Sequence, residues 1–229
     1  LFKSALALWM ILALPSLQAA ALDPAVQQLI VSIAPEWDSM TGRLQCFERS
    51  GDQWRPVTNA WPVIYGKNGL AWGRGVRGTG LPGRQKVERD GRAPAGLFKL
   101  GTIYTYDSAL PAGASFRFHT VGRGDAWVDD VRSPDYNRHI VIPDPVEIRH
   151  NSDPPVAGMG SAIFFHIRRG PQRPSAGCTV MAEENLLRLM RWLRVESEPH
   201  YLLLPRKEYE AKWKAWGLPA PEEMTALTR

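Results

Sequence analysis

Short apolar segments bounded by turn residues recur along most of the chain. Six of them have the length and composition of strands: "AGLFKLGTIYTY", "FRFHTV", "HIVIP", "SAIFFHI", "CTVM" and "HYLLLP". A further stretch, "GRLQCFERSGDQWRPV", alternates apolar and polar side chains on both sides of "SGDQ", which predicts a hairpin with Cys46 as a small apolar filler. Long connections rather than helices separate the segments, so a doubly wound parallel sheet is disfavoured. We therefore predict a mostly β fold with peripheral helices, that is, an α+β protein.

Helical spacing is found in three other segments. "DPAVQQLIVSIAPEWD" places apolar side chains on one face after an Asp-Pro cap, which predicts a short amphipathic helix. "AEENLLRLMRWLR" has a Leu/Met stripe and acidic residues in its first turn, where the helix dipole favours them. "RKEYEAKWKAWGLP" spaces Tyr209, Trp213 and Trp216 along one face and ends at Gly217. We expect the last two helices to pack against the core.

The first residues have the anatomy of a secretory signal peptide. Lys3 precedes an apolar run from Ala5 to Leu14, and a Pro and three small residues ending at Ala21 follow. A membrane anchor needs about 20 apolar residues, and this run is shorter. No later stretch is apolar for long enough, so we expect no integral membrane segment after signal cleavage.

The net charge of the chain does not identify a class of partner. Removing Lys3 with the signal leaves 27 basic and 23 acidic residues, a net charge of +4. This mild excess favours anionic partners without specifying them. The chain has no dense Lys/Arg tract and no interleaved aromatic motif, so a nucleic acid partner is not expected.

Two cysteines in an exported protein raise the possibility of a Cys46–Cys178 disulfide. The five histidines show no short paired spacing with either cysteine, which disfavours a zinc site. The sequence thus implies no metal and no organic cofactor.

His166 and Cys178 flank a loop rich in Gly and Pro, which can fold back and bring the imidazole to the thiol. An imidazolium neighbour lowers the pKa of a thiol from about 8.5 and favours a thiolate nucleophile. Gly177 lacks a Cβ and lets backbone N–H groups turn toward an oxyanion. A Cys and a His in one segment are also compatible with purely structural roles. Ser175 is a weak nucleophile candidate, because the strand, turn and helix of an esterase elbow are absent.

The block "GSAIFFHI…RPSAGCTVM" resembles the catalytic signature of the L,D-transpeptidase family, whose YkuD-type domain carries a His, a loop and then Ser-x-Gly-Cys. "DGRAPAGLFKL" is similar to the family's "DG-x-TP-x-G-x-F" stretch, in which Pro94, Gly96 and Phe98 are more plausibly structural. The resemblance spans Gly42 to Pro205. It implies a YkuD-like β-sandwich with a catalytic groove, and cleavage of the bond between the L centre of meso-diaminopimelate and the terminal D-residue of peptidoglycan stem peptides.

Carried onto this chain, the resemblance implies that Cys178 is the nucleophile and His166 the base that activates it. Ser175, Ala176 and Gly177 would shape the turn, with a carbonyl group there orienting His166. The amides of Gly177 and Cys178 would hold the oxyanion.

This chain departs from the family pattern after the cysteine. Many members have a hydrophobic residue and then an arginine, whereas this chain has Thr179 and Val180. Our hypothesis is that Arg168, Arg169 and Arg173 supply the missing charge for a stem-peptide carboxylate, since guanidinium binds carboxylates well. The alternative is a solvated basic loop.

The resulting prediction has four parts: a signal peptide at 1–21, an N-terminal helix or linker at 22–40, an L,D-transpeptidase-like catalytic domain at 41–206, and a C-terminal helix and tail at 207–229. We expect an exported, periplasmic enzyme of the cell envelope whose partners are peptidoglycan stem peptides. L,D-transpeptidation is favoured, and hydrolysis as an L,D-carboxypeptidase or endopeptidase is the alternative. A catalytically inert wall-binding module is a third possibility, which a Cys46–Cys178 disulfide would favour. The oligomeric state is not predicted.

Overall fold

The computed structural model describes residues 21–123, 125–139 and 146–225, so the predicted signal peptide lies outside it except for its last residue. Its strands are β1 (Gln28–Ala34), β2 (Thr41–Ser50), β3 (Gln53–Pro56), β4 (Trp61–Ile64), β5 (Leu70–Trp72), β6 (Ala93–Thr105), β7 (Phe118–Thr120), β8 (Val146–Ile148), β9 (Phe164–Ile167), β10 (Thr179–Met181) and β11 (His200–Pro205). Its helices are α1 (Glu183–Trp192) and α2 (Arg206–Trp216), with the 3-10 turns η1 (Val195–Ser197) and η2 (Pro221–Glu223). Within the described ranges, none of the helices combines the length and apolarity needed to cross a membrane.

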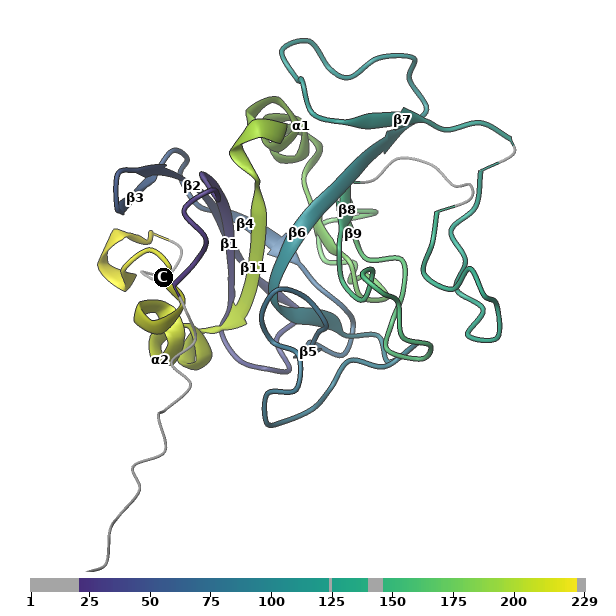
Figure 1. The fold of residues 1–229 in the computed structure, drawn as a ribbon, viewed down its shortest axis with the longest axis horizontal. Coiled ribbons are helices and arrows are strands. Elements are labelled where there is room, and N and C mark those ends of the chain that lie inside the picture. The colour runs from purple at the N-terminus through teal and green to yellow at the C-terminus, as the bar shows by residue number, and fades with distance from the viewer. Residues whose placement is uncertain (1–20, 124, 140–145, 226–229) are drawn as a thin grey trace, which may run out of the picture.

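The described strands form one mixed sheet that closes on itself (Figure 1). The strand order is β1-β11-β6-β8-β9-β10-β4-β2-β3, and β1 also pairs with β2. β5 and β7 add to β6 as parallel neighbours. The prediction of a mostly β protein with peripheral helices is confirmed. The division into the two layers of a sandwich stays a prediction, because the pairing runs through one continuous sheet.

The N-terminal segment is a strand, and the helix predicted there is wrong. All seven residues of Gln28–Ala34 are buried, because β11 flanks this strand on one side and β2 on the other. The polar positions that gave the sequence its helical spacing are satisfied inside the protein. The Gln28 side chain donates to the carbonyl of Trp192 at 2.7 Å, and the Ser32 hydroxyl lies 2.8 Å from that of Tyr65.

The hairpin predicted around "SGDQ" is confirmed. β2 and β3 pair in antiparallel fashion, with Ser50 opposite Gln53 at the turn. Cys46 lies in the middle of β2 and is 1 % exposed. It fills core space, as predicted.

Both C-terminal helices form where the sequence predicts them. α1 buries Leu186, Leu189 and Met190, the stripe seen in the sequence. α2 buries Tyr209 and Trp216 and ends at a residue in the left-handed conformation. In Figure 1, α1 lies at the upper end of the sheet and α2 at its lower left.

β6 contains the upstream motif "APAGLFKLG" and has a structural role. Gly96 has a φ of +139°, and a Cβ there would lie 2.3 Å from the carbonyl oxygen of Arg77. Phe98 is fully buried. The strand predicted at "HIVIP" lies outside the described residues except for His139, which forms an isolated bridge with Trp127.

Candidate active site

Two neighbouring parallel strands bring the predicted nucleophile and base to one place. β9 and β10 pair with Val180 opposite His166, and Cys178 immediately precedes β10. The loop between the strands therefore folds back, as its Gly and Pro content predicts. Both side chains line a single pocket with a volume of about 710 Å³.

One wall of this pocket is apolar. The charged residues that line the pocket include both acidic and basic side chains. Its full lining is Ile103, Tyr104, Thr105, Asp107, Pro111, Trp127, Asp129, Ala162, Phe164, His166, Ile167, Arg169, Cys178, Glu183, Leu186, Leu187 and Met190. The lining comes from β6, from β9, from α1 and from the long segments around β7. Aromatic rings pack edge to face along the wall, with the Trp127 and Phe164 ring centroids 4.9 Å apart.

The turn before the cysteine is held by the Ser175 hydroxyl. It donates to the carbonyl oxygen of Cys178 at 2.6 Å and accepts from the N–H of Gly177 at 3.0 Å. The backbone of Ser175 is also tied to the chain after β4, through Tyr65 at 2.9 Å and Lys67 at 3.0 Å. Ser175 therefore positions the turn, a role that does not require its hydroxyl to be a nucleophile.

Gly177 is required by its conformation and by its surroundings. Its φ is +156°, and a Cβ would lie 2.9 Å from the carbonyl oxygen of Arg92. Its N–H is already bonded to Ser175, which differs from the expectation that this amide faces an oxyanion. Of the two amides named in the sequence interpretation, that of Cys178 is left for this task.

His166 is oriented by the carbonyl group that follows it. Its Nδ1 lies 2.9 Å from the carbonyl oxygen of Ile167, and because a carbonyl only accepts, Nδ1 carries the proton. Nε2 is then the basic nitrogen. The prediction that a carbonyl of the Ser175–Gly177 turn orients the ring is wrong, because the neighbouring residue on β9 already does so.

The imidazole is neutral at neutral pH. Burial lowers the pKa of His166, the hydrogen bond to Ile167 opposes this, and the charge of Arg169 lowers it further. A neutral ring can accept a proton but cannot stabilise a thiolate as an imidazolium would.

The surroundings of Cys178 favour the thiol over the thiolate. Burial raises its pKa to about 11, and the N–H of Phe164 and the charges of Lys86 and Arg169 only partly oppose the shift. The sulfur donates to the carbonyl oxygen of Ala162 at 3.5 Å. A thiolate held by an imidazolium therefore stays a prediction, and the raised pKa favours a deprotonation that accompanies attack.

The two cysteines are not joined. Cys46 and Cys178 are both free thiols. The disulfide considered from the sequence is absent from the described residues, and with it the main argument for an inert module.

The structure separates the three candidate arginines. Arg169 lines the pocket, whereas Arg168 and Arg173 are not among the residues that form it. The backbone N–H of Arg168 donates to Met181 at 2.8 Å, and the Arg173 side chain is exposed. Only Arg169 is placed to meet a bound carboxylate.

The two residues after Cys178 are buried and do not line the pocket. Thr179 is buried with its hydroxyl 2.9 Å from that of Tyr201. Val180 is 2 % exposed and pairs with Ile64 across the sheet. Neither position supplies a charge to the site.

Sequence reasoning missed the aromatic wall and the backbone groups around the sulfur. Tyr104 ends a strand that was predicted for its core side chains, and Trp127 lies in an irregular segment without periodicity. The contacts of the sulfur with Ala162 and Phe164 involve only backbone atoms. No side-chain pattern could have shown them.

Two other histidines have structural partners. His150 is 1 % exposed, accepts from the N–H of Arg74 at 3.1 Å and contacts the carbonyl oxygen of Met159 at 2.8 Å. His200 lies 2.8 Å from the carbonyl oxygen of Glu198.

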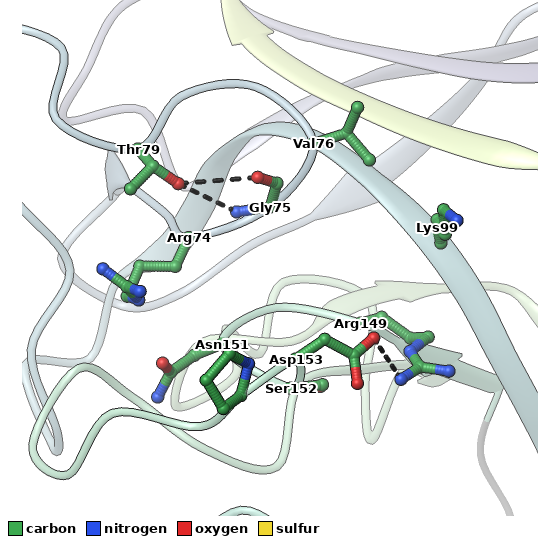
Figure 2. Close-up of a pocket in the computed structure, with 10 residues that line it drawn as sticks. Arg74, Gly75, Val76, Thr79, Lys99, Arg149, Asn151, Ser152 and Asp153 are labelled. Carbon is green, nitrogen blue, oxygen red and sulfur yellow. Dashed lines mark hydrogen bonds and ion pairs between the residues drawn. The ribbon is translucent and has the colours of Figure 1, made fainter. Parts of the chain in front are cut away.

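A second pocket of about 270 Å³ is cationic and shares no residue with the first (Figure 2). Its lining is Arg74, Gly75, Val76, Thr79, Lys99, Arg149, Asn151, Ser152, Asp153 and Pro154. Asp153 is paired with Arg149, as the dashed line in Figure 2 shows. The lining holds neither a cysteine nor a histidine, so the Cys178 pocket is the candidate active site.

Comparisons with known proteins give one family match. The family model for the L,D-transpeptidase catalytic domain, YkuD, matches residues 40–201. No curated protein matches the chain. Among solved structures, a mutant form of the helical cell shape determining protein Pgp2 from Campylobacter jejuni is similar, with 12 % identity, a TM-score of 0.41, and coverage of 82 % of this chain and 50 % of that one. The chain thus spans half the length of that protein.

The family match covers more than half of the chain and includes β9, the nucleophile loop and β10. The resemblance seen in "HIRRGPQRPSAGC" is therefore confirmed, and the chain belongs to the L,D-transpeptidase family.

Proposed function

We propose that this chain is an L,D-transpeptidase that acts on peptidoglycan stem peptides through a thioester at Cys178. The observation that carries the proposal is the pairing of β9 with β10, which brings His166 and Cys178 to one pocket. A base and a sulfur nucleophile in one cleft are the minimum that acyl transfer by this route needs.

The first half-reaction begins with a neutral thiol and a neutral imidazole. As Sγ of Cys178 bonds to the substrate carbonyl carbon, Nε2 of His166 takes the thiol proton. The bond from that carbon to the nitrogen of the terminal D-residue then breaks, and the same proton goes to the leaving amine. The products are a thioester and the free D-amino acid.

The charge that develops on the carbonyl oxygen needs a donor. The N–H of Gly177 is bonded to Ser175, so we assign this task to the N–H of Cys178. Ser175 then contributes by holding the turn in the shape that aims this amide.

The charges of the pocket suit a stem peptide that ends in diaminopimelate and a D-residue. Such a peptide carries both carboxylates and an amine. Arg169 is available for a carboxylate, and Asp107, Asp129 and Glu183 for an ammonium group. This balance favours a zwitterionic peptide over a purely anionic or apolar ligand.

The second candidate is hydrolysis of the same bond. It is favoured by the residues after the nucleophile, because Thr179 and Val180 are buried and give the site no cation where many family members have an arginine. A weaker hold on the peptide would leave water better able to reach the thioester. An L,D-carboxypeptidase or endopeptidase would result.

An inert wall-binding module is disfavoured. It requires a blocked or missing nucleophile, whereas Cys178 is a free thiol on the wall of an open pocket.

The deciding experiment incubates the purified chain with muropeptides of known sequence and identifies the products by mass spectrometry, with Cys178→Ala as the matched control. Dimers joined through two diaminopimelate residues, together with released D-amino acid, would support transfer. Shortened monomers would support hydrolysis. If the parent chain forms neither dimers nor shortened monomers, the proposal is wrong. It is also wrong if the parent and the Cys178→Ala variant give the same products.

The proposed substrate lies in the cell envelope, so we also propose that the protein is exported to the periplasm. The predicted signal peptide at 1–21 supports this location. Cell fractionation of an epitope-tagged full chain would test it, and retention in the cytoplasm would contradict it.

A further inference from the structure

Three polar side chains behind the aromatic wall of the pocket converge on one point. His119 lies on β7, Asp125 in the segment that follows, and His139 further along the chain. One ligand atom of each lies within 4.8 Å of those of the other two. The sequence gives no sign of this cluster, because the spacings match no short metal-binding motif.

The separations are compatible with a bound metal ion, and the hydrogen bond of His119 accounts for only one of them. Oδ1 of Asp125 lies 3.0 Å from Nε2 of His119 and 3.7 Å from Nε2 of His139. Ligands at the usual zinc distances in a tetrahedral site are about 3.4 Å apart, between these two values. The longer separation exceeds the ordinary range of a hydrogen bond.

His139 supplies an independent observation. Its Nε2 is enclosed by protein, yet it has no hydrogen-bond partner among the described residues. A buried polar atom without a partner is costly, and native proteins rarely retain one. A cation held between this nitrogen and Asp125 would satisfy it.

Asp125 is already oriented for such a role. Its Oδ2 accepts the N–H of Gly122 at 2.5 Å, which turns Oδ1 toward the two imidazoles. Outer contacts of this kind commonly fix the ligands of metal sites. The His119 side chain is 44 % exposed, so an ion can enter from solvent.

From this geometry we propose that His119, Asp125 and His139 bind a divalent transition-metal ion of the zinc class. Two imidazole nitrogens and one carboxylate oxygen suit zinc and its neighbours, whereas calcium and magnesium prefer oxygen ligands throughout. Three protein ligands leave one coordination position for water.

The bound ion would fix the wall of the Cys178 pocket. The ring centroid of Tyr104 lies 4.3 Å from that of His139 and 6.0 Å from those of His119 and Trp127. Tyr104 and Trp127 both line the pocket. Joining β7 to the segments that hold Asp125 and His139 would therefore hold these two rings in place, in the part of the chain that extends away from the sheet in Figure 1.

The test is a calorimetric titration of the untagged chain with ZnCl₂. The chain carries Cys178→Ala in every sample, because a thiol beside an imidazole would itself bind zinc. We expect one ion per chain, with the affinity reduced at least tenfold by His119→Gln, by Asp125→Asn and by His139→Gln. The matched control, His166→Gln, should bind as tightly as the parent.

A second measurement leaves the three ligands unchanged. Imidazole NMR of the Cys178→Ala chain should show zinc shifting the resonances of His119 and His139 and leaving those of His166 in place. The proposal is overturned if millimolar zinc shifts neither ligand, if the three variants bind like the parent, or if His166→Gln alone abolishes binding.

Discussion

Cys46 and Cys178 are the same residue type in two different settings. Cys46 lies inside a long strand, with β1 on one side and apolar side chains around it. Cys178 lies at the end of a loop, just before a short strand, on the wall of a pocket. Burial raises the pKa of both thiols, that of Cys46 further.

The comparison shows that a raised pKa does not by itself distinguish a filler from a nucleophile. What differs is the surroundings: Cys178 has an imidazole on the adjacent strand, a backbone N–H at its sulfur and open space for a substrate. Cys46 has none of these among the described residues. Its backbone N–H donates to the Thr58 hydroxyl at 3.0 Å. The surroundings at the end of the loop, rather than the residue type, are therefore what distinguishes Cys178 as the candidate nucleophile.

The largest expected effect is that of Cys178→Ala on turnover. Removing the proposed nucleophile should lower kcat on muropeptides by about 10⁴-fold or more, because the proposed acyl-enzyme forms on this sulfur. Product formation followed by mass spectrometry measures it. Residual activity near that of the parent would mean that a different residue attacks.

The next largest effect is expected in the pH dependence of the alkylation of Cys178. Below a pKa of about 11, the thiolate fraction of Cys178 rises tenfold per pH unit, so the rate with iodoacetamide should rise by about 10³-fold from pH 7 to pH 10. The rate is measured by mass spectrometry in the Cys46→Ala variant. A rate that is flat from pH 6 to pH 9 would show a preformed thiolate and contradict our assignment of a neutral pair.

Gly177→Ala tests the turn that presents the nucleophile. The new Cβ would lie 2.9 Å from the carbonyl oxygen of Arg92, and the backbone has a positive φ, so the turn has to shift. A displacement of this size at a reacting group costs about 10²-fold in kcat/KM. Gly170→Ala is the control in the same loop, because its Cβ would meet only the Arg173 side chain, at 3.7 Å. Equal activities of the two variants would show that the shape of the turn at Gly177 does not affect catalysis.

The basic loop is tested by neutralising one arginine at a time. Arg169→Gln should raise KM about tenfold, the effect of losing one charge-assisted hydrogen bond at a partly exposed site. Arg173→Gln, which changes an exposed side chain outside the pocket, should leave KM unchanged. The same KM for both variants would support a solvated loop without a role in binding.

The smallest effect is expected from Cys46→Ala. Loss of a buried sulfur should lower the free energy of unfolding by about 1 kcal/mol and leave kcat/KM within about twofold of the parent. Urea denaturation and steady-state kinetics measure the two quantities. A large loss of activity without a loss of stability would assign Cys46 a part in catalysis.

The elements that the sequence predicted correctly have a clear local signal. α1 and α2 each bury a single stripe, and the β2–β3 hairpin is marked by its turn residues, although residues 44–47 in the middle of β2 are all buried. β1 was missed because it is buried on both faces and then has no polar side to reveal its period. Its run of Ile30, Val31 and Ile33 is the local signal that could have favoured a strand.

The site was predictable only as far as it is local. His166 and Cys178 are joined by one loop, and the spacing and the family resemblance were enough to pair them. The ring of Trp127, the carbonyl of Ala162 and the hydrogen bond of Ile167 depend on the fold or on backbone atoms. Side-chain identity along the chain does not encode such contacts.

The loop between β9 and Ser175 is anchored at both ends. Arg168 is bonded to Met181 at 2.8 Å, and Ser175 to Tyr65 at 2.9 Å, each through the backbone. We therefore expect that residues 170–174, which do not line the pocket, can be exchanged without moving the sulfur or the imidazole. Arg169 differs from them, because its charge enters the pocket and lowers the pKa of both His166 and Cys178, so a change there couples peptide binding to the chemical step.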